Sequence, residues 1–174
     1  MKNIIINSAF PGHAWEISRL VNSVYRGENS KKGWTTEAEL LGGIRITVNK
    51  ILELIGKRNN EILLAVTDDK IIGCVHLEKI NNKCHLGMLS VDVNYQKEGI
   101  GKLLMGESEN YAKEVFECSE MEMKVIGQRK ELIEYYIRQG YTLTGEKENF
   151  SLNAHFGAPK RNDLYFEFLV KSLL

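Results

Sequence analysis

The sequence predicts an α/β fold with a central mixed, mostly antiparallel sheet of six to seven strands flanked by helices. First, three β-rich runs follow one another over residues 61–67, 71–79 and 83–92. They are separated by Asp68-Asp69 and Asn81-Asn82, pairs typical of tight turns, so we expect an antiparallel meander. Second, a glycine loop, a helical pattern and another strand come next, which is the order of a β-α-β unit.

A strand and a helix are expected at the start of the chain. Residues 4–7 form a short apolar run, and His13 to Tyr25 carry apolar residues at the 3.6-residue spacing of an amphipathic helix. A polar, glycine-bearing loop follows, and Thr35 or Thr36 at its end can cap a helix that starts near Glu37. The other expected elements are a helix from Val48, a helix over Ile100 to Glu117, a strand over Met121 to Ile126, a helix over Lys130 to Gln139, and strands over Tyr141 to Thr144 and Leu164 to Val170.

Composition narrows the classes of function. The 174 residues fit one α/β domain, expected to extend from Met1 to Leu174. Because 23 Lys and Arg residues balance 23 Asp and Glu residues, no basic field favours nucleic acid or anionic lipid. No apolar run approaches the roughly 20 residues of a membrane-spanning helix, and Met1 to Phe10 lack a signal-peptide profile. We expect a soluble protein that binds neither nucleic acid nor membrane.

Cysteine and histidine usage predicts no disulfide and no metal. The three cysteines are odd in number and form no CxxC pair, and a cytoplasmic location follows as the expectation. The histidines show no metal-ligand spacing. They are His13, His76, His85 and His155.

The loop Gln96 to Lys102 is the most informative segment. It follows a buried strand and leads directly into an apolar-striped helix. Its two glycines let the backbone present N–H groups, and the positive end of the helix dipole favours a phosphate. Leu103 after Lys102 excludes a P-loop, and Leu104 replaces the third glycine of a Rossmann fingerprint. The simpler interpretation is a strand-to-helix turn.

The string Gln-x-x-Gly-x-Gly in this loop, after Leu89-Ser90-Val91, resembles the Gln/Arg-x-x-Gly-x-Gly/Ala signature of the GNAT N-acetyltransferase superfamily. The segment ELIEYYIRQGY, residues 131–141, is similar to the FYxRxGF ending of the fourth GNAT helix. From Asn22 onward the chain resembles a less-characterised bacterial subgroup, through YRGENSKKGWTTEAEL and GCVHLEK among other segments.

The resemblance implies acetyl-CoA as co-substrate. Loop amides would bind its pyrophosphate, and the backbone of the preceding strand would pair with pantetheine. The implied cofactor-binding residues are Leu89, Ser90, Val91, Gln96, Lys97, Glu98, Gly99, Ile100, Gly101 and Lys102.

Tyr136, four residues before Gly140, is the expected catalytic acid. Attack of an amine on a thioester expels a CoA thiolate, which a phenol can protonate. The competing interpretation is packing, because Leu132, Ile133 and Tyr136 share one helix face. The order of loop, helix, strand and tyrosine-bearing helix favours the catalytic role.

Two positions depart from the family pattern. Many members carry Asn seven residues before the tyrosine, where this chain has Arg129, and Gln128 is a candidate substitute. Many also carry a carboxylate on the strand before the loop, where this chain has Gly87 and Met88.

The base must therefore come from elsewhere, because an ammonium substrate has to lose a proton before it attacks. Glu78 is the expected base and His76 the second candidate, since both lie on one face of the strand 71–79. Either can instead be an ordinary strand residue.

Substrate-binding residues are expected in the loop after the first helix, which lies over the acceptor cleft in GNAT folds. They are Arg26, Trp34 and Glu37. The alternatives are that Trp34 only covers the core and that Arg26 and Glu37 pair at the surface.

These features predict an acetyl-CoA-dependent N-acetyltransferase that moves the acetyl group directly to a primary amine of a small molecule or amino-acid-like substrate. A protein or peptide N-acetyltransferase and a non-catalytic acyl-CoA-binding sensor are the alternatives. The expected partner is a small-molecule amine, and a homodimer is compatible with the sequence.

Overall fold

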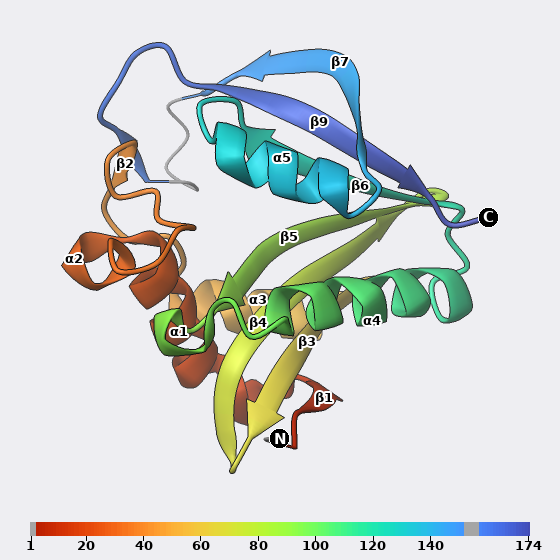
Figure 1. Cartoon of the computed structure of the whole chain (residues 1–174). Helices are drawn as coiled ribbons and strands as arrows, with labels where there is room; N and C mark the ends of the chain where they lie inside the picture. Colours follow the sequence, from red (N-terminus) through yellow and green to blue (C-terminus); the bar gives the residue numbers. More distant parts are fainter. Residues whose placement is uncertain (1–2, 152–156) are drawn as a thin grey trace.

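A seven-stranded sheet forms the centre of the protein (Figure 1). The structure is a computed structural model that describes residues 3–151 and 157–174, so His155 lies outside the described residues. The strand order is β1-β3-β4-β5-β6-β9-β7, and β5–β6 is the parallel pair. The strands are β1 (Ile5–Ser8), β2 (Leu41–Gly42), β3 (Asn60–Thr67), β4 (Lys70–Ile80), β5 (Lys83–Val91), β6 (Glu120–Ile126), β7 (Thr142–Asn149), β8 (Ala158–Pro159) and β9 (Tyr165–Ser172). The predicted α/β class with a mixed, mostly antiparallel sheet is confirmed.

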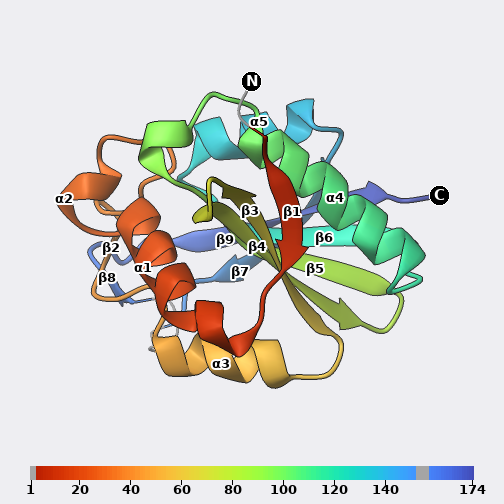
Figure 2. The same cartoon turned by 90° about the horizontal axis from the view of Figure 1, so that it is seen from below.

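Helices cover both faces of this sheet (Figure 2). They are α1 (Ala14–Tyr25), α2 (Gly27–Ser30), α3 (Val48–Gly56), α4 (Ile100–Glu114) and α5 (Lys130–Arg138), with 3-10 turns η1 (Pro11–His13) and η2 (Val93–Tyr95). Ile17 of α1 and Ile51 of α3 are fully buried in one core, and Leu104 of α4 and Leu132 of α5 belong to the core on the other face. No helix within the described ranges is long and apolar enough to cross a membrane.

The predicted meander is confirmed, because β3, β4 and β5 pair antiparallel in sequence order. Asp68 and Asp69 turn the chain between β3 and β4 with φ of +47° and +58°. Asn81 turns it between β4 and β5 with φ of +56°. Asp and Asn tolerate this left-handed conformation better than most residues, which is why the turns were readable in the sequence.

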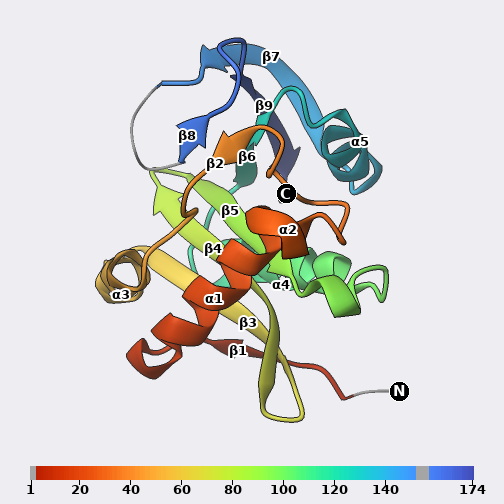
Figure 3. The ribbon, with the colours of Figure 1, turned by 90° about the vertical axis from the view of Figure 1, so that its left-hand side faces the viewer.

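The helix predicted to start near Glu37 is wrong. The chain makes one turn there, in which the N–H of Leu41 donates to the carbonyl of Glu37 at 2.9 Å. The chain then enters the short strand β2, which pairs with β8 (Figure 3), and Gly43 directly after this strand adopts φ of +78°. A tertiary strand pairing thus replaces the helix that local propensity favoured.

Strands β5 and β6 separate partway along their length. Their pairing runs from Lys83 opposite Glu120 to Leu86 opposite Met123 and stops there. Met88, with φ of +56°, is an irregularity in β5 directly after this point. The remaining part of β5 stays paired with β4 and leaves the edge facing β6 open, as Figure 1 shows.

Candidate active site

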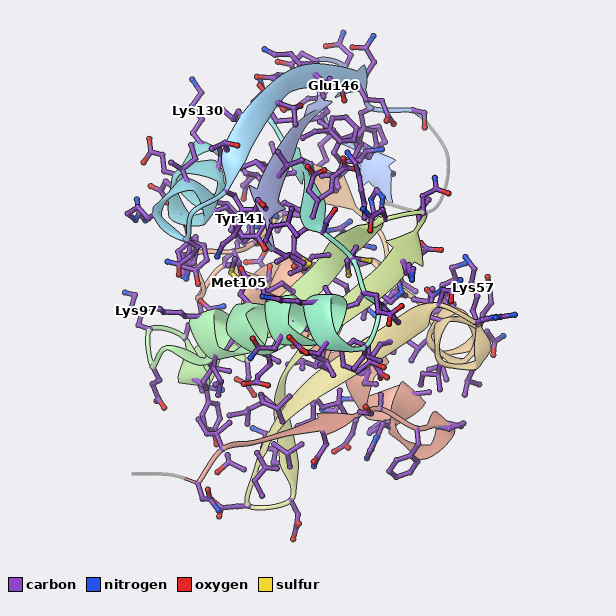
Figure 4. The ribbon with its side chains drawn as sticks, turned by 90° about the vertical axis from the view of Figure 1, so that its right-hand side faces the viewer. Lys57, Lys97, Met105, Lys130, Tyr141 and Glu146 are labelled. Atoms are coloured by element: carbon purple, nitrogen blue, oxygen red, sulfur yellow. The ribbon has the colours of Figure 1, made fainter. Side chains whose placement is uncertain are left out.

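The amino-terminal end of α4 is open toward a cavity. Gly99 precedes the helix with φ of +82°, a conformation that glycine adopts without steric cost. No side chain caps this end, so the first backbone N–H groups of the helix lack intrahelical partners. Figure 4 shows Lys97 at the tip of the loop that leads into α4.

The cavity has a volume of about 580 Å³ and lies between this loop, the end of β5 and α5. The sequence-predicted cofactor residues that line it are Leu89, Val91, Gln96, Lys97, Gly99, Ile100, Gly101 and Lys102. Two others do not line it. Ser90 is 1% exposed and donates to the carbonyl of Met88, and Glu98 is exposed to solvent.

A second cleft, of about 290 Å³, has His76 and Glu78 of β4 in its wall. These strand positions face the α1 and α3 side of the sheet, whereas the first cavity lies on the α4 and α5 side. The two spaces meet where β5 and β6 separate. The residues that line both are Tyr25, Leu89, Arg129, Leu132 and Tyr136.

Tyr136 lies at this junction and is 6% exposed. Its hydroxyl has no hydrogen-bond partner among the residues that the structure describes. Burial, with a smaller effect of the neighbouring Tyr25, raises the pKa of Tyr136 far above its ordinary value. The phenol therefore stays protonated and can donate to a group bound at the junction.

Tyr25 is a second tyrosine at the junction that the predicted site omitted. Its hydroxyl donates to the main-chain carbonyl of Leu89, and burial raises its pKa. The two residues are 64 positions apart in the sequence, so no local pattern could have paired them.

Trp34 lines the first cavity and not the second cleft. Its ring packs edge-on against Tyr135, with 5.3 Å between ring centroids. The main-chain N–H of Trp34 donates to Gln96 Oε1 at 3.2 Å. The loop after α1, which was expected to lie over the acceptor, thus contacts the glycine loop through Gln96. Trp34 covers the first cavity on that side.

Arg26 and Glu37 form an ion pair, but in the interior and not at the surface. Their side chains are 6% and 10% exposed. Glu37 lines the second cleft and is shared with Arg129, whose Nη1 donates to Glu37 Oε1 at 2.9 Å. Gln128, the candidate substitute for the family asparagine, instead donates to the carbonyl of Asp163 at 2.6 Å.

Glu78 and His76 both lie in the second cleft. Lys57 donates to Glu78 at 2.7 Å, and this hydrogen bond lowers the pKa of Glu78. Burial lowers the pKa of His76 to about 4, and its Nε2 is 2.7 Å from Asn60 Oδ1. Both groups are thus unprotonated at neutral pH.

Their distances from the junction differ. Glu78 lies opposite His85 of β5, whereas His76 lies opposite Gly87. Leu89 of β5 lies at the junction. At about 3.3 Å per residue, His85 is roughly 13 Å along the strand from Leu89, and Gly87 is roughly 7 Å from it. His76 is therefore closer to the junction than Glu78.

A further pair in this cleft was absent from the predicted site. His85 Nδ1 lies 3.2 Å from Glu122 Oε1, where β5 and β6 still pair. The two residues are 37 positions apart in the sequence and are brought together by the pairing of β5 with β6. The periodicity of either strand alone could not reveal this pair.

Comparison with known proteins identifies the family. The model of the acetyltransferase (GNAT) family matches residues 28–141. The chain therefore belongs to the GNAT family of acetyltransferases. A search of curated proteins finds no match.

Solved structures share the fold. An N-acetyltransferase from Staphylococcus aureus Mu50 is 17% identical with a TM-score of 0.75, and 98% of each chain is covered. The ribosomal-protein-S18-alanine N-acetyltransferase from Escherichia coli is 9% identical with a TM-score of 0.73, over 98% of this chain and 94% of that one. A Bacillus anthracis protein solved in complex with acetyl-CoA is 23% identical with a TM-score of 0.58, over 69% of this chain and 67% of that one.

Proposed function

We propose that the protein transfers the acetyl group of acetyl-CoA directly to a primary amine of a small, amino-acid-like molecule. The observation that carries this proposal is the cavity that joins three features. These are the uncapped amino-terminal end of α4, the open backbone edge of β5 and the hydroxyl of Tyr136. The Bacillus anthracis structure, which holds acetyl-CoA, supports this choice of co-substrate.

In this proposal the N–H groups of the loop Gln96 to Lys102 bind the pyrophosphate of acetyl-CoA. The backbone of Leu89 to Val91 pairs with pantetheine, since its edge toward β6 carries no strand partner. The thioester then lies near Tyr136, at the junction with the second cleft, from which the amine enters.

The reaction requires one proton donor and one proton acceptor. The amine nitrogen attacks the thioester carbonyl, the carbon–sulfur bond breaks, and Tyr136 protonates the departing thiolate. Glu78 is the proposed acceptor of the amine proton, and His76 is the alternative closer to the junction. Glu78 lies opposite His85, roughly 13 Å along β5 from Leu89 at the junction. In this proposal it therefore accepts the proton through water.

The test is release of free CoA thiol from acetyl-CoA in the presence of a panel of primary amines, with mass spectrometry of the acceptor. We expect amine-dependent thiol release and a product heavier by one acetyl group. Acetyl-CoA binding without transfer to any amine, peptide amino terminus or lysine would instead favour the sensor alternative.

A further inference from the structure

Two arginines share the carboxylate of Glu37, and one of them, Arg129, lines the junction. Glu37 pairs with Arg26 through one carboxylate oxygen and with Arg129 through the other. The side chains of Glu37 and Arg129 are each 10% exposed, and that of Arg26 is 6% exposed. Arg129 thus shares its carboxylate with a second guanidinium, and both pairs are largely removed from water. Because a buried charge is costly unless it is fully paired, the shared carboxylate leaves Arg129 able to stabilise a further anion beside it.

Arg129 is the member of this cluster that reaches the reaction site, because it lines both the first cavity and the second cleft. Its Nη1 donates to Glu37 and its Nη2 donates to the carbonyl of Thr35, which fixes the guanidinium in place. A guanidinium has five N–H groups, and within the described residues these are the two hydrogen bonds that Arg129 makes. The remaining donors are available to a ligand at the junction.

The other carboxylates of the second cleft do not supply this anion. Glu78 is paired with Lys57 at 2.7 Å, and Glu122 is paired with Lys83 at 3.2 Å. Glu37 is the carboxylate within ion-pair distance of Arg129 in the described part of the chain. The counterion is therefore expected from the bound acceptor.

We propose that Arg129 binds a carboxylate of the acceptor, so that the substrate class is the free α-amino acids and close relatives. The inference rests on the proposed function, because the amine must reach the thioester at the junction that Arg129 lines. Amine and carboxylate must then lie a few bonds apart in the same molecule. The planar guanidinium matches a carboxylate through two parallel hydrogen bonds. A peptide amino terminus has an amide in this place and lacks the charge.

Arg129→Gln is the variant that tests this assignment. It removes the guanidinium and leaves the Arg26 to Glu37 ion pair intact, so no buried carboxylate loses all of its partners. Arg129→Lys is a second variant, which keeps the positive charge but lacks the planar guanidinium. Arg19→Gln, on the exposed side of α1 beside Trp15, is the matched control.

The experiment measures kcat and KM for the twenty amino acids, their carboxamides and the corresponding amines without a carboxyl group. We expect the wild-type protein to prefer amino acids over carboxamides by about 10- to 100-fold in kcat/KM. This preference should vanish in Arg129→Gln through KM, be intermediate in Arg129→Lys, and persist in Arg19→Gln.

Wild-type protein that acetylates carboxamides as well as amino acids would leave the proposed function standing and overturn the role of Arg129. So would an undiminished preference in Arg129→Gln. If no amine is acetylated, the proposed function fails. Titration calorimetry with N-acetyl amino acids and their amides then tests separately whether Arg129 binds a carboxylate. Binding of the acids by wild type and not by Arg129→Gln supports the assignment, and any other result overturns it.

Discussion

The hydroxyl oxygen of Tyr135 lies 3.4 Å from the position that a Cβ atom on Gly101 would occupy. Val91 Cγ2 is 3.9 Å from the same point. A side chain at residue 101 would therefore enter the space between the first turn of α4, α5 and the end of β5. In the proposed function, this is where the backbone of the loop approaches the phosphates of acetyl-CoA.

We expect Gly101→Val to weaken CoA binding by about tenfold or more, since the added methyl groups overpack this space. Gly106→Val is the matched control, because a Cβ at Gly106 of the same helix meets no atom within 4 Å. Calorimetric titration of both folded variants with CoA measures the effect. Equal affinity of Gly101→Val and wild type would remove the loop from the cofactor site.

Tyr136→Phe should lower kcat by about 10²- to 10⁴-fold, because it deletes the proton donor for the thiolate. Affinity for acetyl-CoA should change little, since the ring remains in place. Tyr111→Phe removes a hydroxyl that donates to Glu61 at 2.9 Å, away from both pockets, and serves as control. Turnover of Tyr136→Phe at the wild-type rate would exclude Tyr136 as the acid.

Much of the fold was predictable because its signals are local. The Asp68-Asp69 and Asn81-Asn82 turns supply the left-handed residues that hairpins need, and Gly99 does the same at the start of α4. These residues predict the meander and the glycine loop without knowledge of any tertiary contact.

The chemistry at the junction was not predictable in the same way. Arg129 contacts Glu37 and Thr35 across 92 and 94 residues, and such contacts form only in the folded chain. The irregular Met88 that accompanies this separation has no sequence signal of its own, since methionine rarely adopts positive φ.

Glu78→Gln should depress acetyl transfer by about 10²-fold, most strongly at low pH, where the substrate amine is mostly protonated. The hydrogen bond from Lys57 lowers the pKa of Glu78, so the wild-type carboxylate remains a proton acceptor well into the acidic range. Glu53→Gln is the control, because it removes a carboxylate on α3 that also pairs with a lysine, Lys50, at 2.7 Å. It should leave the pH-rate profile unchanged. Superimposable pH-rate profiles of Glu78→Gln and wild type would place the base elsewhere.

The stability of the protein should depend on pH through His76. Its pKa is about 4 in the folded state, below the ordinary value of 6.5, because burial disfavours the charged ring. The unfolded chain therefore takes up the proton first, and the free energy of unfolding falls as pH drops from about 6.5 toward 4.

Urea denaturation across this pH range measures the effect. His76→Asn should lose less stability between pH 6.5 and 4 than wild type, whereas the control His13→Asn should follow wild type. Identical pH dependence of wild type and His76→Asn would show that this histidine does not contribute.

Glu37→Gln should lower the free energy of unfolding by about 3 to 5 kcal/mol, because it removes the carboxylate that two buried guanidinium groups share. Arg129→Gln should cost less, since Glu37 keeps Arg26 as partner. Chemical denaturation of the two variants compares them. A loss below about 1 kcal/mol for Glu37→Gln is typical of exposed pairs and would contradict a buried cluster.

A crystal structure of the protein with bound acetyl-CoA tests the central claim most directly. We expect the pyrophosphate on the backbone N–H groups of the loop Gln96 to Lys102, pantetheine along Leu89 to Val91, and the sulfur within about 3 to 3.5 Å of the Tyr136 hydroxyl. A cofactor bound outside this cavity, or a thioester out of reach of Tyr136, would contradict the proposed acetyl transfer at the junction.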